Sequence, residues 1–238
     1  MKPEPDWVPG VTAGYHAASS WYILAELLQR IDGRRFPTLV RREIFDRLLM
    51  NRSFCGMSEA EHTQFQKSLV PMFNRWRGAE ERLAWHDQMH CRAVSPGGNS
   101  RGPARELGRF YECLLASLPD CREMPRQGIL HPERAVEFIS RHRSGQYDQT
   151  FRHTIDFGLG CIIDSNQYGV DTVPYGFSPY CSPRTFGHGG NQSSIGFADP
   201  VQQLVVVVVT NGMPGEPRHQ QRNRMVNSAI YEDLGLAT

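Results

Sequence analysis

The feature of this sequence that most constrains its fold is a pair of apolar runs near the C-terminus. The second run, at 204–210, contains five consecutive valines, and β-branched residues favour strands. The first run, at 194–198, is separated from it by Asp199-Pro200 and three further residues, a connection of hairpin length. We therefore predict two neighbouring antiparallel strands, preceded by the glycine-rich segment 186–191.

Helical patterns dominate the sequence before residue 153, and strand-like runs follow, beginning with 155–163. Apolar residues recur at helical spacing from Leu24 to Ile31, which predicts a packing face, and Gly33 supplies a stop. Further helices are predicted near 37–49, at 104–118 and from Pro132. Another is predicted to begin at Ser58, which forms a capping box with Glu61, and to break at Pro71. The last is predicted to begin at Pro217, with Met225, Ile230 and Leu234 available for packing. The sequence thus predicts an α/β fold with a mainly helical region at 1–152 and an antiparallel-sheet region at 153–238.

Composition excludes several classes of protein. The 238 residues carry a net charge of +1 and are 39% hydrophobic, so neither a nucleic acid nor a membrane surface is indicated as a partner. The six cysteines form no C-x-x-C pair, which favours reduced, buried thiols. No apolar stretch approaches the length of a membrane span, and the Met1 end carries no secretory pattern, so we expect a cytoplasmic protein.

Common catalytic and cofactor motifs are absent from the sequence. No Gly-Lys pair forms a P-loop, no G-x-G-x-x-G follows a strand, and no serine has glycine two positions before and two after it. His86 and His90 have the spacing of a helical zinc site, but Asp87 replaces the usual glutamate and no third ligand is evident. We interpret them as surface histidines, and we expect neither a metal nor a cofactor.

Four motifs, in order along the chain, resemble those of one enzyme family. They are Tyr15-His16-Ala17 ahead of a helix, Ser95-Pro96-Gly97-Gly98, Phe157-Gly158-Leu159-Gly160, and His188-Gly189-Gly190 in the segment 186–191. Each match alone is weak, but their order resembles the serine β-lactamase and penicillin-binding-protein family, in its esterase-like branch of class C type. The resemblance implies the β-lactamase/transpeptidase-like fold, an antiparallel sheet flanked by helices with an added helical region.

The family's nucleophile, a serine with lysine three positions later, has no counterpart in this sequence. The only lysines are Lys2 and Lys67, and position 64 is a glutamine. The resemblance therefore implies a chain that corresponds to the C-terminal part of a hydrolase and is incomplete at its N-terminus. It also implies that the strand at 205–209 would pair on one side with a strand outside this sequence, so we expect self-association through an unpaired sheet edge.

By position in the motifs, the resemblance assigns roles to five residues. Tyr15 would be the general acid or base, active when nearby cations lower its pKa. His188 would take the place of the family's cation, and a largely neutral imidazole would donate a hydrogen bond to a neutral ester, whereas a lysine suits a carboxylate. Gly189 and Gly190 would let the substrate approach the strand, and the N–H of Asn191 would bind an oxyanion.

Two departures and one alternative bear on this site. Ala17 stands where the family often has asparagine, which removes one polar contact. Tyr175, Phe177 and Tyr180 are interpreted either as the lining of an acyl pocket or as ordinary packing. The resemblance implies a serine hydrolase that cleaves small carboxylic esters or amides through an acyl-enzyme, with the nucleophile outside this sequence. The alternatives are a non-catalytic binding protein of the same family and an inactive gene fragment.

Overall fold

The computed structural model describes residues 6–78, 80–121 and 128–237. Within them, the α-helices are α1 (Ser19–Asp32), α2 (Phe36–Val40), α3 (Glu59–Phe65), α4 (Gln88–Arg92), α5 (Ala104–Leu115), α6 (Pro132–Ile139) and α7 (Glu216–Asp233). Short 3₁₀ or π turns are η1 (Arg41–Phe45), η2 (Gln66–Ser68), η3 (Trp76–Gly78), η4 (Ala84–His86) and η5 (Asn166–Tyr168). The strands are β1 (Phe54–Cys55), β2 (Phe73–Asn74), β3 (Glu81–Arg82), β4 (Ser100–Arg101), β5 (Tyr147–Asp148), β6 (His153–Thr154), β7 (Asp156–Phe157), β8 (Ile162–Ile163), β9 (Phe186–Gly190), β10 (Ser194–Asp199), β11 (Leu204–Val209) and β12 (Gly212–Met213).

The central sheet has five antiparallel strands in the order β11-β10-β9-β8-β7. The predicted hairpin of β10 and β11 is confirmed, with Asp199 paired to Leu204 at its closed end. The Asp199 carboxylate accepts the Val201 N–H at 3.0 Å, which stabilises the turn. Within the described residues β11 has no strand on its outer side, so the edge that the sequence analysis expected to be unpaired is open here.

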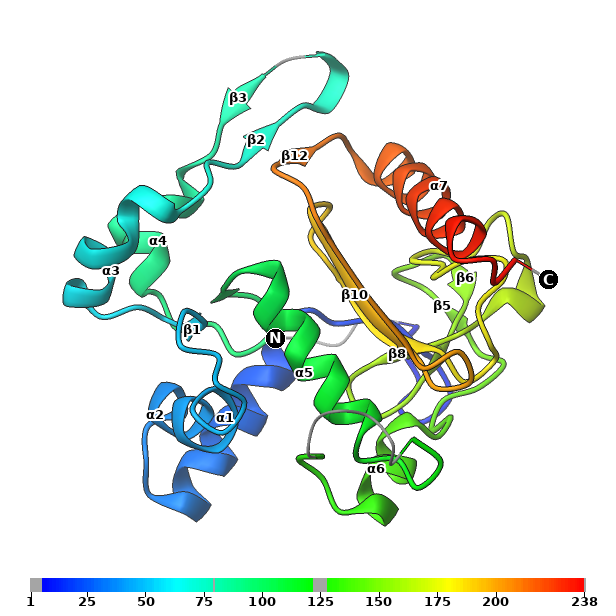
Figure 1. The fold of residues 1–238 in the computed structure, drawn as a ribbon, viewed down its shortest axis with the longest axis horizontal. Helices are drawn as coiled ribbons and strands as arrows, with labels where there is room; N and C mark the ends of the chain where they lie inside the picture. The colour runs from blue at the N-terminus through cyan, green and yellow to red at the C-terminus, as the bar shows by residue number, and fades with distance from the viewer. Residues whose placement is uncertain (1–5, 79, 122–127, 238) are drawn as a thin grey trace.

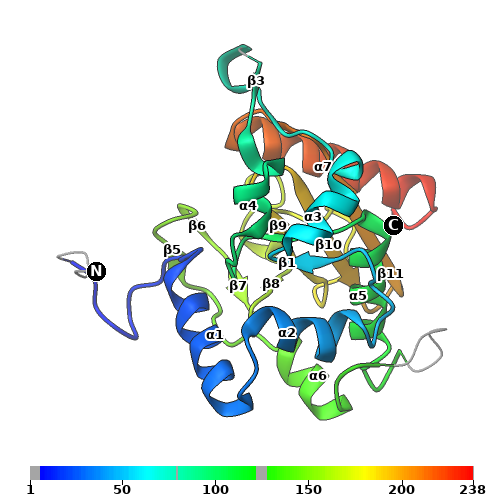
Figure 2. The same ribbon diagram turned by 90° about the vertical axis from the view of Figure 1, so that its left-hand side faces the viewer.

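Helices cover both faces of this sheet (Figures 1 and 2). On one face, Phe186 and Ala198 pack with Tyr111 and Leu115 of α5. On the other face, Phe197 and Val206 pack with Tyr231 of α7. Strand side chains alternate between faces, which is why neighbouring residues of β10 belong to different apolar clusters. The predicted α/β fold, an antiparallel sheet flanked by helices, is confirmed.

Smaller sheets join the segments that surround the central one. β1 pairs with β4, and β5 pairs with β6. β2 pairs in parallel with β12 and antiparallel with β3, so the arm formed by β2 and β3 reaches the chain just after β11 (Figure 1). Two backbone bonds of 2.9 Å, from Phe73 N–H to the Asn211 carbonyl and from Arg75 N–H to the Met213 carbonyl, hold this arm in place.

Several predicted elements differ from the observed ones. The capping box of Ser58 and Glu61 is present, but the helix that it begins ends at Phe65, before Pro71. The run at 155–163 forms a tight hairpin of β7 and β8, because Gly160 adopts a φ of +84° in the turn. On α7 the exposed residues include Met225 and Leu234, whereas the buried ones are polar or aromatic: His219, Asn223, Asn227 and Tyr231.

The apolar face of α1 is also exposed rather than packed. Ala25 is the only buried residue of the helix, while Leu24 and Leu27 are each 49% exposed and Ile31 is 83% exposed. A contiguous apolar surface of this kind is typical of an interaction site. The helical periodicity was sufficient to predict the helix, but it carried no information about what covers its face.

We expect the isolated chain to self-associate at micromolar concentrations through the α1 face, the open edge of β11, or both. Replacing Leu24 and Leu28 by glutamate should raise the dissociation constant at least about tenfold, because two large apolar contacts are lost. Sedimentation velocity measures this constant. The matched control is Met225→Glu on α7, which is 66% exposed and should leave association unchanged. Exposed strand edges associate at concentrations on the order of 100 μM. The expectation would be contradicted if the chain stays monomeric at about that concentration.

None of the helices in the described ranges combines the length and apolar composition that crossing a bilayer requires.

Candidate functional site

Tyr15 lies just before α1 and is held by the β5–β6 hairpin. Its N–H donates to Asp148 Oδ1 at 3.1 Å, and its carbonyl accepts from the Thr150 hydroxyl at 2.9 Å. Its ring stacks on Phe151 with centroids 4.9 Å apart. The position of Tyr15 is therefore fixed by a segment more than 130 residues away in the sequence.

Asp148 organises this side of the site. The carboxylate is fully buried, and Oδ1 also accepts the N–H groups of Thr150 and Phe151 at 2.9 Å each. Its other oxygen pairs with Arg143 at 2.8 Å, and the Arg143 guanidinium lies 4.2 Å from the centre of the Phe157 ring. A buried carboxylate with these partners fixes both Tyr15 and Arg143.

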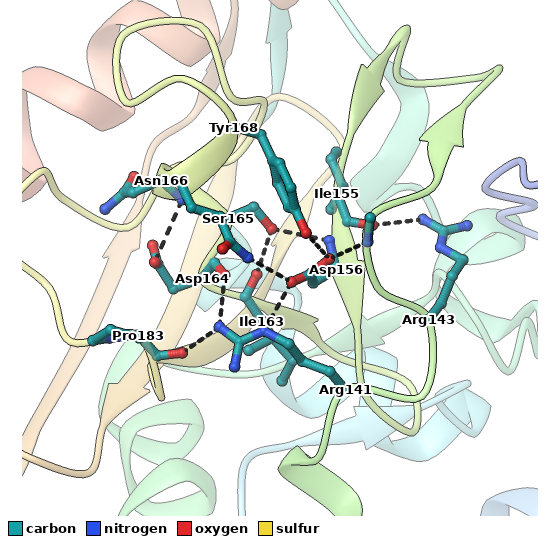
Figure 3. Close-up of polar contacts among 12 residues, drawn as sticks. Arg141, Arg143, Ile155, Asp156, Ile163, Asp164, Ser165, Asn166, Tyr168 and Pro183 are labelled. Carbon is teal, nitrogen blue, oxygen red and sulfur yellow. Dashed lines mark hydrogen bonds and ion pairs between the residues drawn. The ribbon is translucent and has the colours of Figure 1, made fainter.

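A second buried carboxylate, Asp156, anchors the strand that carries Phe157. Figure 3 shows the Tyr168 hydroxyl and the Arg141 guanidinium pointing toward it, with hydrogen bonds of 3.1 and 2.8 Å. Arg141 also donates to the Pro183 carbonyl at 2.6 Å. Because Arg141 binds Asp156 of β7 and Arg143 binds Asp148 of β5, the segment between α6 and β5 is tied to both strands.

His188 comes from β9 and lies beside Tyr15 in the lining of an open cavity of about 230 Å³. The two ring centroids are 5.5 Å apart. The cavity is lined mainly by aromatic and polar side chains, including Tyr15, Ser20, Trp21, Arg143, Phe157 and His188. The structure thus brings together the two residues that the sequence analysis predicted to be catalytic.

Burial sets the protonation states of this pair. It raises the pKa of Tyr15 above its ordinary value of 10.0, so the phenol is protonated at neutral pH. The expectation that cations lower this pKa is not met in this structure. Burial lowers the pKa of His188 below 6.5, so the imidazole is neutral at pH 7, as the sequence analysis expected.

The three predicted substrate-binding residues follow His188 along the strand. A Cβ added to Gly189 would lie on the face of the sheet opposite His188, 2.2 Å from the Tyr175 ring. The packing of Tyr175 therefore also requires glycine at this position. Gly190 ends β9, and Asn191 and Gln192 form the turn to β10 with φ of +25° and +58°. Positive φ at both central positions is typical of a type I′ hairpin turn. Asn191 is exposed.

The residues left with alternative interpretations take structural positions. Phe177 is buried in the apolar cluster beneath the sheet, Tyr175 packs against Gly189, and the Tyr180 hydroxyl bonds Glu232 at 3.2 Å. None of the three lines the cavity described above, which favours the packing interpretation. In the part of the chain that the structure describes, no three His, Cys, Asp or Glu side chains are grouped to hold a metal ion.

Sequence reasoning missed Asp148, Arg143, Trp21 and Ser20. Ser20 is the serine of the cavity lining, but no described residue makes a hydrogen bond to its hydroxyl. It thus lacks the adjacent base that activates a nucleophilic serine. A local signal existed only for Asp148, since an Asp two residues before Thr150 is typical of a side-chain-capped turn.

Comparison with known proteins identifies a relationship over nearly the whole chain. A family model described as Beta-lactamase matches residues 1–230. None of the curated proteins compared with the chain matches it in sequence.

Solved structures with the same fold include EstA and two penicillin-binding-protein homologues. EstA from Arthrobacter nitroguajacolicus Rue61a is 23% identical with a TM-score of 0.67, over 100% of this chain and 64% of that one. A novel penicillin-binding protein homologue from Caulobacter crescentus is 22% identical with a TM-score of 0.63, over 91% and 58% of the two chains. The octameric homologue from Pyrococcus abyssi is 16% identical with a TM-score of 0.62, over 90% and 41%. The chain therefore spans less than two thirds of the length of each.

Proposed function

Since the chain belongs to the beta-lactamase family, we propose that it forms one wall of the active-site cleft of a serine hydrolase that cleaves carboxylic esters. The nucleophile would come from a polypeptide segment outside this sequence. The observation that carries the proposal is the contact between Tyr15 and His188 in the lining of one cavity. Burial lowers the pKa of His188, and a neutral imidazole suits a neutral ester better than a substrate that bears a carboxylate.

In this proposal each predicted residue has a defined task. Tyr15 transfers a proton to or from the leaving group, a role for which a protonated phenol suits the acid step. The Asn191 N–H is one oxyanion donor. The attacking serine forms an acyl-enzyme that water later hydrolyses. The octameric state of the Pyrococcus abyssi homologue supports self-association as a property of this chain as well.

The experiment begins with the DNA upstream of the Met1 codon. The longest open frame that contains this chain is expressed, and hydrolysis of p-nitrophenyl butyrate is compared with hydrolysis of a chromogenic cephalosporin. The proposal expects an in-frame Ser-x-x-Lys, ester turnover in excess of cephalosporin turnover, and loss of both when that serine is replaced by alanine. An upstream stop codon together with no hydrolysis would overturn it.

One observation favours a second candidate, a non-catalytic binding protein of the same family. Lys67 lies in η2, on the segment between α3 and β2, and Ser20 has no base beside it. Among the residues that the structure describes, the cleft therefore holds no activated serine. In this case the chain would bind small esters in the cavity without hydrolysing them, whether it is expressed alone or within the longest open reading frame.

A further inference from the structure

The hydrogen-bonding state of His188 determines what kind of group the cavity can recognise. Its Nδ1 lies 2.7 Å from the carbonyl oxygen of Gly189. A carbonyl oxygen only accepts, so Nδ1 must carry the hydrogen. Turning the ring over would place a carbon at that distance, which is shorter than the 3.3–3.6 Å of a C–H···O contact. The tautomer therefore follows from the strand geometry.

A neutral imidazole with hydrogen on Nδ1 has a lone pair on Nε2. No described residue makes a hydrogen bond to Nε2 of His188, and the atom is not fully enclosed by protein. His188 is one of the residues that line the cavity, and Nε2 lies on the ring edge away from the carbonyl that Nδ1 binds. The sequence analysis expected this imidazole to donate a hydrogen bond to an ester, but Gly189 already accepts its only hydrogen.

We propose that His188 is a specificity residue that accepts a hydrogen bond from the ligand, so that the cavity selects neutral esters bearing a hydroxyl or N–H group. That the ligand is an ester rests on the proposed function. The preference for a hydrogen-bond donor concerns binding alone. A ligand carboxylate would face the Nε2 lone pair and be disfavoured. A ligand with acceptors alone would leave Nε2 unpaired, at a cost of about one hydrogen bond.

The charged and titratable neighbours are consistent with this assignment. Tyr15 and His16 line the same cavity, and the Tyr111 hydroxyl lies near the His188 backbone. Arg143, the permanent cation among the described residues of the lining, is paired with Asp148 and lies over Phe157. Its charge is thereby compensated by a buried carboxylate, which leaves less attraction for an anionic ligand.

The first test reads the tautomer directly. The chain is labelled with ¹⁵N-histidine, its nine histidines are resolved by long-range ¹H–¹⁵N spectra at pH 7.5, and His188 is assigned from the spectrum of His188→Gln. We expect hydrogen on Nδ1 and none on Nε2, with titration below pH 6.5. Hydrogen on Nε2, or on both nitrogens at pH 7.5, overturns the proposal whether or not the protein hydrolyses esters.

The second test measures ligand preference with three probes of matched shape: methyl 4-hydroxybenzoate, methyl 4-methoxybenzoate and monomethyl terephthalate. NMR titration should show the hydroxyl probe binding about tenfold tighter than the methoxy probe, the size of one hydrogen bond to an otherwise unpaired acceptor. The carboxylate probe should bind most weakly. His188→Phe should remove the preference, and the control Tyr22→Phe, which alters an exposed tyrosine outside the cavity lining, should keep it.

Each other outcome of the second test counts against the proposal. The assigned selectivity is overturned by equal binding of the hydroxyl and methoxy probes or by tightest binding of the carboxylate. It is also overturned if His188→Phe keeps the preference, if Tyr22→Phe loses it, or if no probe binds. Hydrolysis is measured in neither test. A protein that binds with this preference but never turns esters over would therefore refute the proposed function and leave this inference standing.

Discussion

Tyr15→Phe is expected to lower ester turnover by about two orders of magnitude or more in the protein that carries this chain together with its nucleophile segment. Removing a positioned general acid or base typically costs this much. The substitution deletes only the hydroxyl, and the stacking of the ring on Phe151 at 4.9 Å is retained. Ligand binding should change much less than turnover, so the loss should fall on kcat rather than on KM.

The matched control for this prediction is Tyr22→Phe. Tyr22 is 49% exposed on α1, and its hydroxyl makes one long bond of 3.4 Å to the Val94 carbonyl. Steady-state kinetics with p-nitrophenyl butyrate should find Tyr22→Phe unchanged. If Tyr15→Phe is as active as the control, Tyr15 is not the residue that transfers the proton.

Asp148→Ala should lower the free energy of unfolding by about 3 kcal/mol or more, because it leaves the half-buried Arg143 without its partner. It also removes the acceptor of three backbone N–H groups, those of Tyr15, Thr150 and Phe151. Urea unfolding followed by far-UV circular dichroism measures the change. The signal of the near-UV aromatic bands should also weaken, since Tyr15 loses its anchor beside Phe151.

Two variants separate charge from local geometry at this position. Asp148→Asn keeps an acceptor for the N–H groups but loses the ion pair, so it should cost less than Asp148→Ala. Asp171→Ala, an exposed carboxylate, should stay within about 0.5 kcal/mol of the unsubstituted chain, as surface changes usually do. Equal stability of Asp148→Ala and Asp171→Ala would refute the anchoring role of Asp148.

Local sequence patterns were sufficient to predict the elements that build the sheet and its two covering helices. The valine run and the Asp199-Pro200 turn predicted β10 and β11, and the apolar spacing after residue 103 predicted α5. The motif order also placed Tyr15 and His188 at one site, and the structure brings their rings together. These features depend on short-range periodicity and turn chemistry, which a single sequence contains.

The support of the site could not be predicted, because it depends on partners far apart in the chain. Nothing near Asp148 in the sequence indicates that its carboxylate binds the backbone of Tyr15. The sequence indicated Met225, Ile230 and Leu234 as packing residues, yet Met225 and Leu234 are exposed. His219 and Asn227 are fully buried instead, because the loop at Tyr175 and Gly176 packs against them. The apolar pattern of α1 suggested burial, yet Ile31 is exposed. Periodicity predicts a helix but not the environment of its faces.

The most direct test of the account is whether this chain alone is acylated. Tyr15 and His188 line a cleft in which the described residues include no activated serine, so incubation with p-nitrophenyl acetate or a labelled penicillin should produce no stoichiometric adduct on any serine. Intact-mass measurement followed by peptide mapping detects one. A single adduct on Ser20, absent in Ser20→Ala, would show that the chain holds its own nucleophile and would contradict the account.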